Sequence, residues 1–203
     1  LDGVIVATPH KTHTAIARDV LQAGLHLLLE KPMTLYARDA RDLVELARAK
    51  GREIVIGYHG PFQSHAIRGR EVIAGGEFGP VQYVDSSYCS NLNNFLNGNV
   101  SEESPLLSRF AVNPPSASYN SPEEMGGGMG HLNLTHGIGL MLFVSGLRAK
   151  RVTALMNNLG RALDMVDAFS VEFDNGALGI VGGTGNAVGT SRVSLAVYCE
   201  SGA

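Results

Sequence analysis

The sequence predicts an α/β region followed by an α+β region, because the order of its elements changes part-way along the chain. Over residues 1–60, short apolar strands alternate with amphipathic helices in the order β-α-β-α-β, which right-handed crossovers turn into a parallel sheet. Over residues 150–200, strands follow one another with no helix between them, which favours a mainly antiparallel sheet. We therefore expect half of a doubly wound domain over residues 1–60 and an α+β domain over residues 61–203.

The elements of the first region are set by apolar periodicity and by glycine stops. The first strand is a continuous apolar run, which is typical of a strand buried on both faces. Ile16 and Val20 lie on one face of the first helix, which Gly24 ends, and Gly51 ends the second helix. The predicted elements are strands 4–7, 26–29 and 54–56 and helices 12–23 and 34–50.

The second region mixes helices with strands and contains a long irregular segment. Asp174-Asn175-Gly176 has the composition of a hairpin turn. Residues 91–125 are rich in Asn, Ser and Pro and have no clear period, so we interpret them as a loop that shapes a substrate pocket. The predicted elements are helices 66–74 and 129–144 and strands 81–88, 152–156, 168–173, 177–181 and 193–198.

The composition excludes several classes of protein. A chain of 203 residues that is 44% hydrophobic and 17% charged is globular. A net charge of −3 argues against a nucleic-acid-binding or membrane-surface protein. No apolar run approaches the roughly 18 residues of a membrane span. Cys89 and Cys199 are far apart, which disfavours a disulfide framework and indicates a reducing cytoplasm.

Both ends of the chain resemble cut ends. The sequence opens on Leu1 inside a strand-like segment, without an initiator methionine, and it stops at Ala203 just beyond another strand. We therefore expect a longer protein, with an incomplete first domain and a second domain that is incomplete at its carboxyl end.

The tripeptide Glu30-Lys31-Pro32 is the strongest candidate for chemistry. It follows the strand at 26–29, and ligands of open α/β sheets bind outside the carboxyl ends of the strands. Proline restricts its own backbone and that of the preceding residue, so Lys31 is held stiffly outside a helix. The alternative is a turn in which Lys31 is solvated.

Five motifs occur in a characteristic order, and together they resemble the Gfo/Idh/MocA family of NAD(P)-dependent oxidoreductases, which act on sugars, polyols and related compounds. The resemblance covers nearly the whole chain and implies the C-terminal half of a Rossmann-type parallel sheet, followed by a domain that binds substrate and forms oligomers. The motifs are the strand and turn at 4–9 with His13, Glu30-Lys31-Pro32, Gly57-Tyr58, Gly126-Gly127-Gly128 with His136, and the hairpin at 174–177.

The resemblance implies a bound NAD or NADP, a small sugar or polyol as substrate, and a homo-oligomer formed through the antiparallel sheet. From the charge, the hydropathy and the spacing of the histidines, we expect no partner of nucleic acid or membrane and no metal. His13 is either close to the cofactor or a capping residue, and Tyr58 borders the nicotinamide or is a solvated strand-end tyrosine. The implied cofactor-binding residues are Thr8, Pro9, His10, His13, Glu30, Lys31 and Tyr58.

The implied catalytic pair is Lys31 and His136. Oxidation of an alcohol requires a group that stabilises the developing alkoxide and a group that accepts the hydroxyl proton. Lys31 supplies charge and a donor, and desolvation would lower its pKa; His136 titrates near neutrality and is the base, unless it is a core histidine. The implied substrate-binding residues are Lys31, His59, His131, Asn133 and His136.

Metal binding is not expected. His10 and His13 have no acidic or cysteine partner nearby, and zinc requires three or four converging ligands. His131 and His136 would lie about 140° apart on an α-helix. We interpret Arg109 as a solvated loop arginine, with contact to an anionic substrate as the alternative.

The sequence departs from the family pattern in two places. The glycine-rich dinucleotide turn and the acid that binds the ribose are missing before Leu1, so we expect residues 1–203 alone to bind NAD(P) weakly or not at all and to be inactive. Leu132 stands where many members carry aspartate, four residues before the histidine, and His131 and Asn133 flank it as possible substitutes.

One glycine-rich run is not a cofactor motif. Residues 183–189 lead into an alternating strand, whereas a dinucleotide turn opens a helix. Two alternatives to a dehydrogenase stay open: a non-catalytic dinucleotide-binding sensor or regulator, and a sugar hydrolase or lyase that uses NAD transiently.

Overall fold

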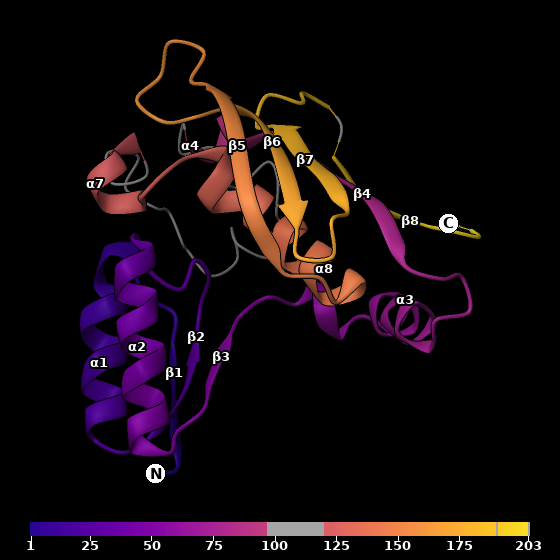
Figure 1. The fold of residues 1–203 in the computed structure, drawn as a ribbon. Helices are drawn as coiled ribbons and strands as arrows, with labels where there is room; N and C mark the ends of the chain where they lie inside the picture. The colour runs from indigo at the N-terminus through magenta and orange to yellow at the C-terminus, as the bar shows by residue number, and fades with distance from the viewer. Residues whose placement is uncertain (97–119, 190, 203) are drawn as a thin grey trace.

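The computed structural model describes residues 1–96, 120–189 and 191–202 and contains two sheets (Figure 1). The first has the order β1-β2-β3 and is parallel throughout, as the alternation of strands and helices predicts. The second has the order β5-β6-β7-β4-β8 and is mainly antiparallel. The fold class predicted from the sequence is therefore confirmed.

The parallel sheet is built from β1 (Gly3–Val6), β2 (His26–Leu29) and β3 (Ile54–Ile56), joined by the crossover helices α1 (His13–Gln22) and α2 (Ala37–Lys50). Val6, Leu29 and Ile56 are in register, so all three strands end at the same edge. The helix predicted to begin at residue 34 begins at Ala37, because the Thr34 hydroxyl donates to the Tyr36 carbonyl and a turn forms there instead.

Helices α1 and α2 cover only one face of this sheet (Figure 1). Leu27 and Leu29 pack against the helices in a core with Leu21 and Leu43. On the opposite face, Ile5 keeps 73% of its surface exposed. The prediction that the strand at 4–7 is buried on both faces is therefore wrong for this structure, because its apolar run meets helices on one side only.

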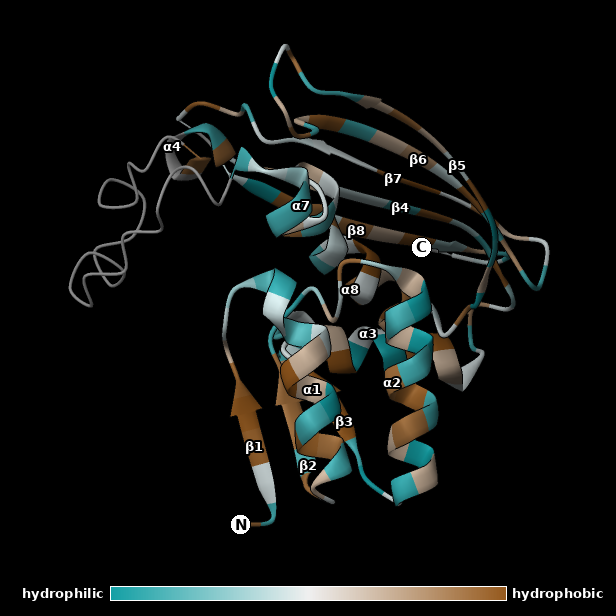
Figure 2. Ribbon diagram, turned by 90° about the vertical axis from the view of Figure 1, so that its left-hand side faces the viewer, coloured by the Kyte–Doolittle hydropathy of each residue, from teal (hydrophilic) through white to brown (hydrophobic). Residues whose placement is uncertain are grey.

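The second region begins with α3 (Ser64–Gly75), and α8 (Thr135–Ser145) packs against its sheet. Figure 2 shows α8 on the side of the five-stranded sheet that faces the parallel sheet and its helices, which together form the N-terminal unit. Its core includes Val84, Phe173 and Val181 from the sheet and Met141 from α8. The strands are β4 (Val81–Cys89), β5 (Ala149–Asn157), β6 (Val166–Phe173), β7 (Leu178–Thr184) and β8 (Arg192–Cys199).

Three details differ from the sequence-based expectation. Strand β4 lies between β7 and β8 and pairs with β7 in parallel, because the chain crosses from β4 to the far edge at β5 and comes back through β6 to β7. Two short helices, α4 (Leu92–Leu96) and α7 (Pro122–Met125), occur inside the segment predicted to be irregular. The predicted helix 129–144 begins as a π-helical turn over Gly130–Leu134, which continues into α8.

The glycine-rich run at 183–189 joins β7 to β8 and opens no helix, which confirms that it is not a dinucleotide turn. A Cβ at Gly183 would overlap the Tyr88 carbonyl oxygen, so close strand packing accounts for this glycine. No helix among the described residues has both the length and the apolar character needed to cross a bilayer.

The one-sided burial of β2 can be tested on two adjacent leucines. Leu29→Ala is expected to lower the free energy of unfolding by about 3 kcal/mol, because Leu29 is fully buried and the truncation leaves a cavity. Leu28→Ala, on the open face, should lower the free energy of unfolding by less than about half as much as Leu29→Ala does. Urea denaturation monitored by circular dichroism measures both, and equal costs would show that the two faces are equally covered.

Candidate active site

Lys31 lies at the carboxyl edge of the parallel sheet and reaches the second region. Its Nζ donates to the Leu132 carbonyl oxygen at 3.0 Å, in the π-turn that precedes α8. Burial lowers the pKa of the Lys31 ammonium, and the charge of Glu30 opposes that shift. The lysine is therefore a half-buried cation held in place by a backbone carbonyl.

Glu30 holds the backbone of the turn. Its Oε2 accepts a hydrogen bond from the Lys31 backbone N–H at 3.1 Å. A Cβ at Gly57 would lie 3.1 Å from Glu30 Oε1, so the carboxylate lies directly against that glycine. The glycine after β3 is thus the residue that leaves room for the Glu30 side chain.

His13 connects the turn after β1 to the turn after β2. Its ring is wholly buried, with Nδ1 at 2.8 Å from the Pro32 carbonyl oxygen and Nε2 at 2.8 Å from the Thr8 carbonyl oxygen. Such a ring has no surface left for a ligand. In this structure His13 therefore supports the turns at Thr8-Pro9 and Lys31-Pro32.

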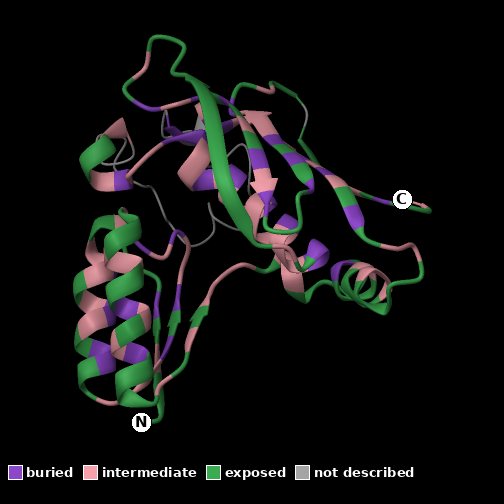
Figure 3. Cartoon of the chain, in the orientation of Figure 1, coloured by how far each residue is buried: buried purple, intermediate pink, exposed green. Residues whose placement is uncertain are grey.

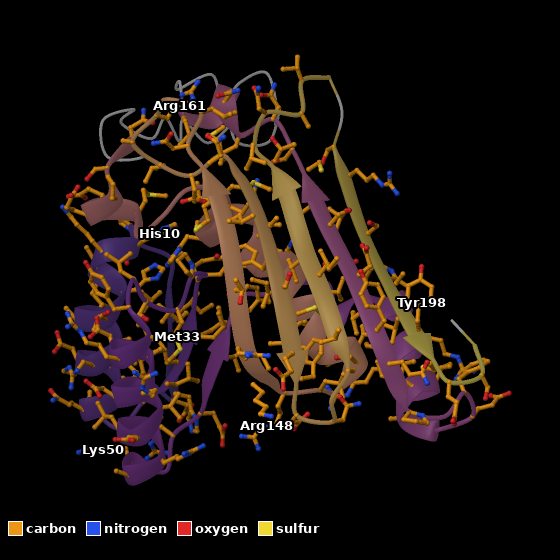
Figure 4. All side chains as sticks on the ribbon, turned by 45° about the horizontal axis from the view of Figure 1, so that its top comes forward. His10, Met33, Lys50, Arg148, Arg161 and Tyr198 are labelled. Atoms are coloured by element: carbon orange, nitrogen blue, oxygen red, sulfur yellow. The ribbon has the colours of Figure 1, made fainter. Side chains whose placement is uncertain are left out.

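His10 lies where the N-terminal unit meets α7 (Figure 4). Its Nδ1 is 3.4 Å from the Met125 carbonyl oxygen, and the neighbouring Lys11 forms an ion pair of 2.6 Å with Glu124. Burial lowers the pKa of His10 to about 4, assisted by the charge of Lys31 and opposed by the Met125 carbonyl. His10 is therefore neutral at pH 7.

The glycine triplet is shaped by Asp164, a residue that the sequence does not single out. The Asp164 carboxylate accepts hydrogen bonds from the backbone N–H groups of Gly128 and Gly130, each at 2.7 Å, and its carbonyl accepts one from Met129 at 2.9 Å. A Cβ at Gly128 would overlap that carbonyl oxygen. The π-turn and α8 together form the candidate active-site helix, and its start is therefore capped from the segment between β5 and β6.

His136 lies on the first turn of α8 among aromatic rings. Its ring centroid is 5.3 Å from that of His59, 5.8 Å from that of Tyr58 and 6.2 Å from that of Tyr88. Burial lowers the pKa of His136 to about 4, assisted by the charges of Lys31 and His59. Its Nδ1 is buried and has no hydrogen-bond partner among the described residues. It is therefore a neutral imidazole with an unused nitrogen.

Tyr58 fixes one side of this histidine. Its hydroxyl shares a short hydrogen bond with the Thr135 hydroxyl, and its ring lies against Gly139. Burial raises the pKa of Tyr58, so its hydroxyl keeps its proton near neutral pH.

The residues around Leu132 point in three directions. The Leu132 side chain is in the core, so only its backbone carbonyl meets Lys31. His131 lies against the glycine triplet, where a Cβ at Gly127 would be 2.7 Å from its Nδ1. Asn133 donates to the Ser90 hydroxyl at 2.7 Å. Among the described residues, neither polar neighbour of Leu132 is hydrogen-bonded to Lys31.

A cavity of about 790 Å³ extends from the histidines between α3, α8 and β8. His59, Tyr88 and His136 line one end. Beyond them the wall is mostly apolar and includes Leu140 and Val197. Arg109 and the centre of the long segment predicted to shape a substrate pocket lie outside the described residues.

Comparison with known proteins places this site in a family. Residues 1–58 match the oxidoreductase family with an NAD-binding Rossmann fold, and residues 67–203 match the GFO/IDH/MocA C-terminal domain. The chain belongs to the Gfo/Idh/MocA oxidoreductase family. The two matched ranges correspond to the two sheets of the structure.

Relatives and solved structures resemble this member over different lengths. A 1-carboxy-3-chloro-3,4-dihydroxycyclohexa-1,5-diene dehydrogenase of Comamonas testosteroni is 25% identical over 87% of the chain and 40% of its own length. A D-xylose 1-dehydrogenase (NADP(+)) of Hypocrea jecorina is 41% identical over 40% of the chain and 21% of its own. GenD2 from gentamicin A biosynthesis, solved with NAD, is 26% identical with a TM-score of 0.80, over 100% of the chain and 53% of its own.

The fold is also shared with an inositol dehydrogenase homologue from Azotobacter vinelandii, solved with NAD⁺, at a TM-score of 0.82 and 24% identity over 98% of the chain. The Gfo/Idh/MocA chain described here spans about half the length of these solved proteins and 40% of the Comamonas relative.

The neutral state of His136 can be tested by NMR titration. The imidazole resonance that disappears in His136→Gln is expected to titrate with a midpoint near 4 instead of the ordinary 6.5, because burial and Lys31 disfavour the imidazolium. Since the folded pKa is below the unfolded one, this group should weaken folding as the pH falls from 6.5 toward 4. A midpoint near 6.5 would contradict the buried, uncharged environment.

Proposed function

We propose that the protein carrying this chain is an NAD(P)-dependent dehydrogenase that moves a hydride between the cofactor and the carbinol carbon of a sugar, polyol or related compound. The observation that carries the proposal is the pairing of a half-buried lysine with a neutral histidine that has an unused ring nitrogen, where the sheet edge meets the active-site helix. The family to which the chain belongs supports it.

The residues at the sheet edge fit the nicotinamide end of such a cofactor. The turn at Thr8-Pro9 follows β1 at the edge where ligands of open α/β sheets bind, and Lys31 and Tyr58 follow β2 and β3 at the same edge. The unpartnered Nδ1 of His136 is a polar atom available to a bound group nearby. When bound, the nicotinamide accepts or donates the hydride, and this chain's residues handle the proton.

Lys31 acts on the substrate oxygen. Its ammonium already donates to the Leu132 carbonyl at 3.0 Å and has two further N–H groups to offer. A positive donor stabilises the charge that develops on the oxygen as the hydride leaves. Because burial lowers the pKa of Lys31, the ammonium also shares its proton more readily.

His136 acts as the base. It is neutral at pH 7, because burial holds its pKa near 4, and Nδ1 has a lone pair when the proton is on Nε2. Tyr58, tied to Thr135, holds one side of the ring edge-on and limits its rotation. The imidazole is thereby oriented to accept a hydroxyl proton.

The cavity beside His136 supports a substrate that carries an apolar part. Its wall is mostly apolar, although Gln63, Arg68 and Ser194 also line it, so a polyol that filled it would leave many of its hydroxyls without partners. The cyclic diol named for the Comamonas relative has an apolar ring of this kind, whereas the Hypocrea relative is named for a sugar. Cyclic diols therefore belong beside sugars in any substrate panel.

One observation favours a second candidate function, a non-catalytic dinucleotide-binding regulator. Leu132 stands where many members carry aspartate, its side chain is in the core, and its carbonyl occupies one Lys31 donor. Tight cofactor binding with no reduction across sugars, polyols and cyclic diols would favour this candidate over the dehydrogenase.

Lys31→Met in the full-length protein is expected to lower kcat/KM by about 10²- to 10⁴-fold on the best substrate of that panel, because the donor and its charge are lost. Initial rates followed by NAD(P)H absorbance measure it. Lys50→Met, on the exposed end of α2, removes the same charge elsewhere and should leave the rate within about twofold. Unchanged kcat/KM for Lys31→Met would overturn the mechanism.

The large sheet supports the further proposal of a homo-oligomer. Strand β5 is exposed along its whole length (Figure 3), and a set of apolar side chains on one face of the sheet is exposed together. Contiguous exposed apolar surface of this kind marks interaction sites. This open face consists of Leu155, Val166, Leu178, Ile180 and Tyr198.

Ile180→Lys is expected to shift the full-length protein toward monomers, because a charge at the centre of the open face opposes its burial. Analytical ultracentrifugation over a concentration series measures the change. Val188→Lys, on the exposed loop before β8, is the matched control and should leave the mass unchanged. An oligomer that is equally stable in both variants would place the interface elsewhere.

A further inference from the structure

Two aspartates from the segment before and at the start of β6 converge on the first turn of the active-site helix. A Cβ at Gly130 would lie 3.3 Å from Asp167 Oδ2 and 3.5 Å from Asp164 Oδ2. Both carboxyl groups therefore approach the same backbone atom, close to the glycine triplet. The Lys31 and His136 chemistry proposed above uses neither of them.

The two carboxyl groups differ in their surroundings. Although burial opposes its ionisation, the N–H groups of Gly130 and Gly128 hold the pKa of Asp164 below its usual value. Asp167 is 2% exposed, and neither of its oxygens has a hydrogen-bond partner among the described residues. Burial, followed by the neighbouring Asp164, raises the pKa of Asp167 to about 7. At neutral pH, Asp164 is therefore the charged member and Asp167 is about half protonated.

A continuous set of hydrogen bonds runs from this pair to the lysine. Asp164 binds the N–H groups of Gly128 and Gly130 at 2.7 Å. The Gly128 carbonyl accepts the Leu132 N–H at 2.8 Å, and the Leu132 carbonyl accepts Lys31 Nζ at 3.0 Å. A shift of the glycine turn would therefore move the acceptor that holds Lys31.

We propose that Asp164 and Asp167 form a carboxyl pair that positions the π-turn, so that the Leu132 carbonyl holds the Lys31 ammonium in its working place. Asp164 supplies the two acceptors that fix the turn. Asp167 fills the remaining space beside Gly130 and carries the proton that lets two carboxyl groups lie so close together. Both are positioning residues, because they act through the helix backbone.

The pair should make the turn sensitive to pH. Above about pH 7, Asp167 loses its proton, and two buried negative charges then repel each other. Since the folded pKa of Asp167 is higher than the unfolded one, its contribution to stability is present at low pH and is lost as the pH rises toward 7. Asp164 is the charged group that faces Asp167 among the described residues.

The first test is hydrogen–deuterium exchange of residues 128–134 in the full-length protein, which requires no substrate. Asp164→Ala should accelerate exchange in this segment at least about tenfold, because two charge-assisted hydrogen bonds are lost. Asp164→Asn keeps one acceptor oxygen and should show a smaller change. Asp167→Asn should exchange like wild type near pH 4 but lack the acceleration that wild type shows as the pH rises from about 4 to about 7. Asp42→Asn, an exposed carboxylate on α2, is the control.

The second test separates positioning from simple structural support. Asp164→Asn should lower kcat about tenfold relative to wild type and leave the KM for the cofactor unchanged. When both proteins also carry Lys31→Met, their kcat values should be equal. Unchanged exchange in both Asp164 variants would overturn the pair. Faster exchange with unchanged kcat would overturn its positioning role. If Lys31→Met alone leaves turnover intact, the proposed function fails, while the exchange results still decide whether the pair holds the turn.

Discussion

The hydrogen bond from Lys31 to the Leu132 carbonyl is the contact on which the site depends. It joins a turn of the parallel sheet to a helix that begins about one hundred residues later, and it ends on a backbone atom. The contacts of His10 with Met125 and of Lys11 with Glu124 join the same two regions nearby. A half-buried hydrogen bond is stronger than one exposed to solvent. The Lys31 bond therefore holds the turn after β2 and the start of the helix in place relative to each other.

The charge of Lys31 acts on two histidines of the site. The ammonium of Lys31 contributes to the lowered pKa values of both His10 and His136, so two histidines near it stay neutral. The Leu132 side chain lies in the core and carries no charge, so it does not offset this effect.

The sequence was sufficient for the parallel pairing of the first sheet, the hairpin at Asp174-Asn175-Gly176 and the proximity of Lys31 to the helix that bears His136. It was not sufficient for the π-turn, because apolar periodicity does not distinguish one extra residue in a turn. Asp164 and Asp167 carry no motif and act through tertiary contacts that span more than thirty residues. The burial of β1 on one face only depends on which elements cover the strand. The apolar run of β1 itself does not show which elements those are.

The π-turn at Gly130–Leu134 has a consequence for how this region tolerates changes in length. A π-turn holds one residue more than the α-helix that continues from it, and each residue of an α-helix rotates the chain by about 100°. Deleting one residue there would allow an unbroken α-helix and would change which backbone carbonyl lies beside Lys31. The count of residues between Gly128 and His136 is therefore as strict a requirement as their chemical identity.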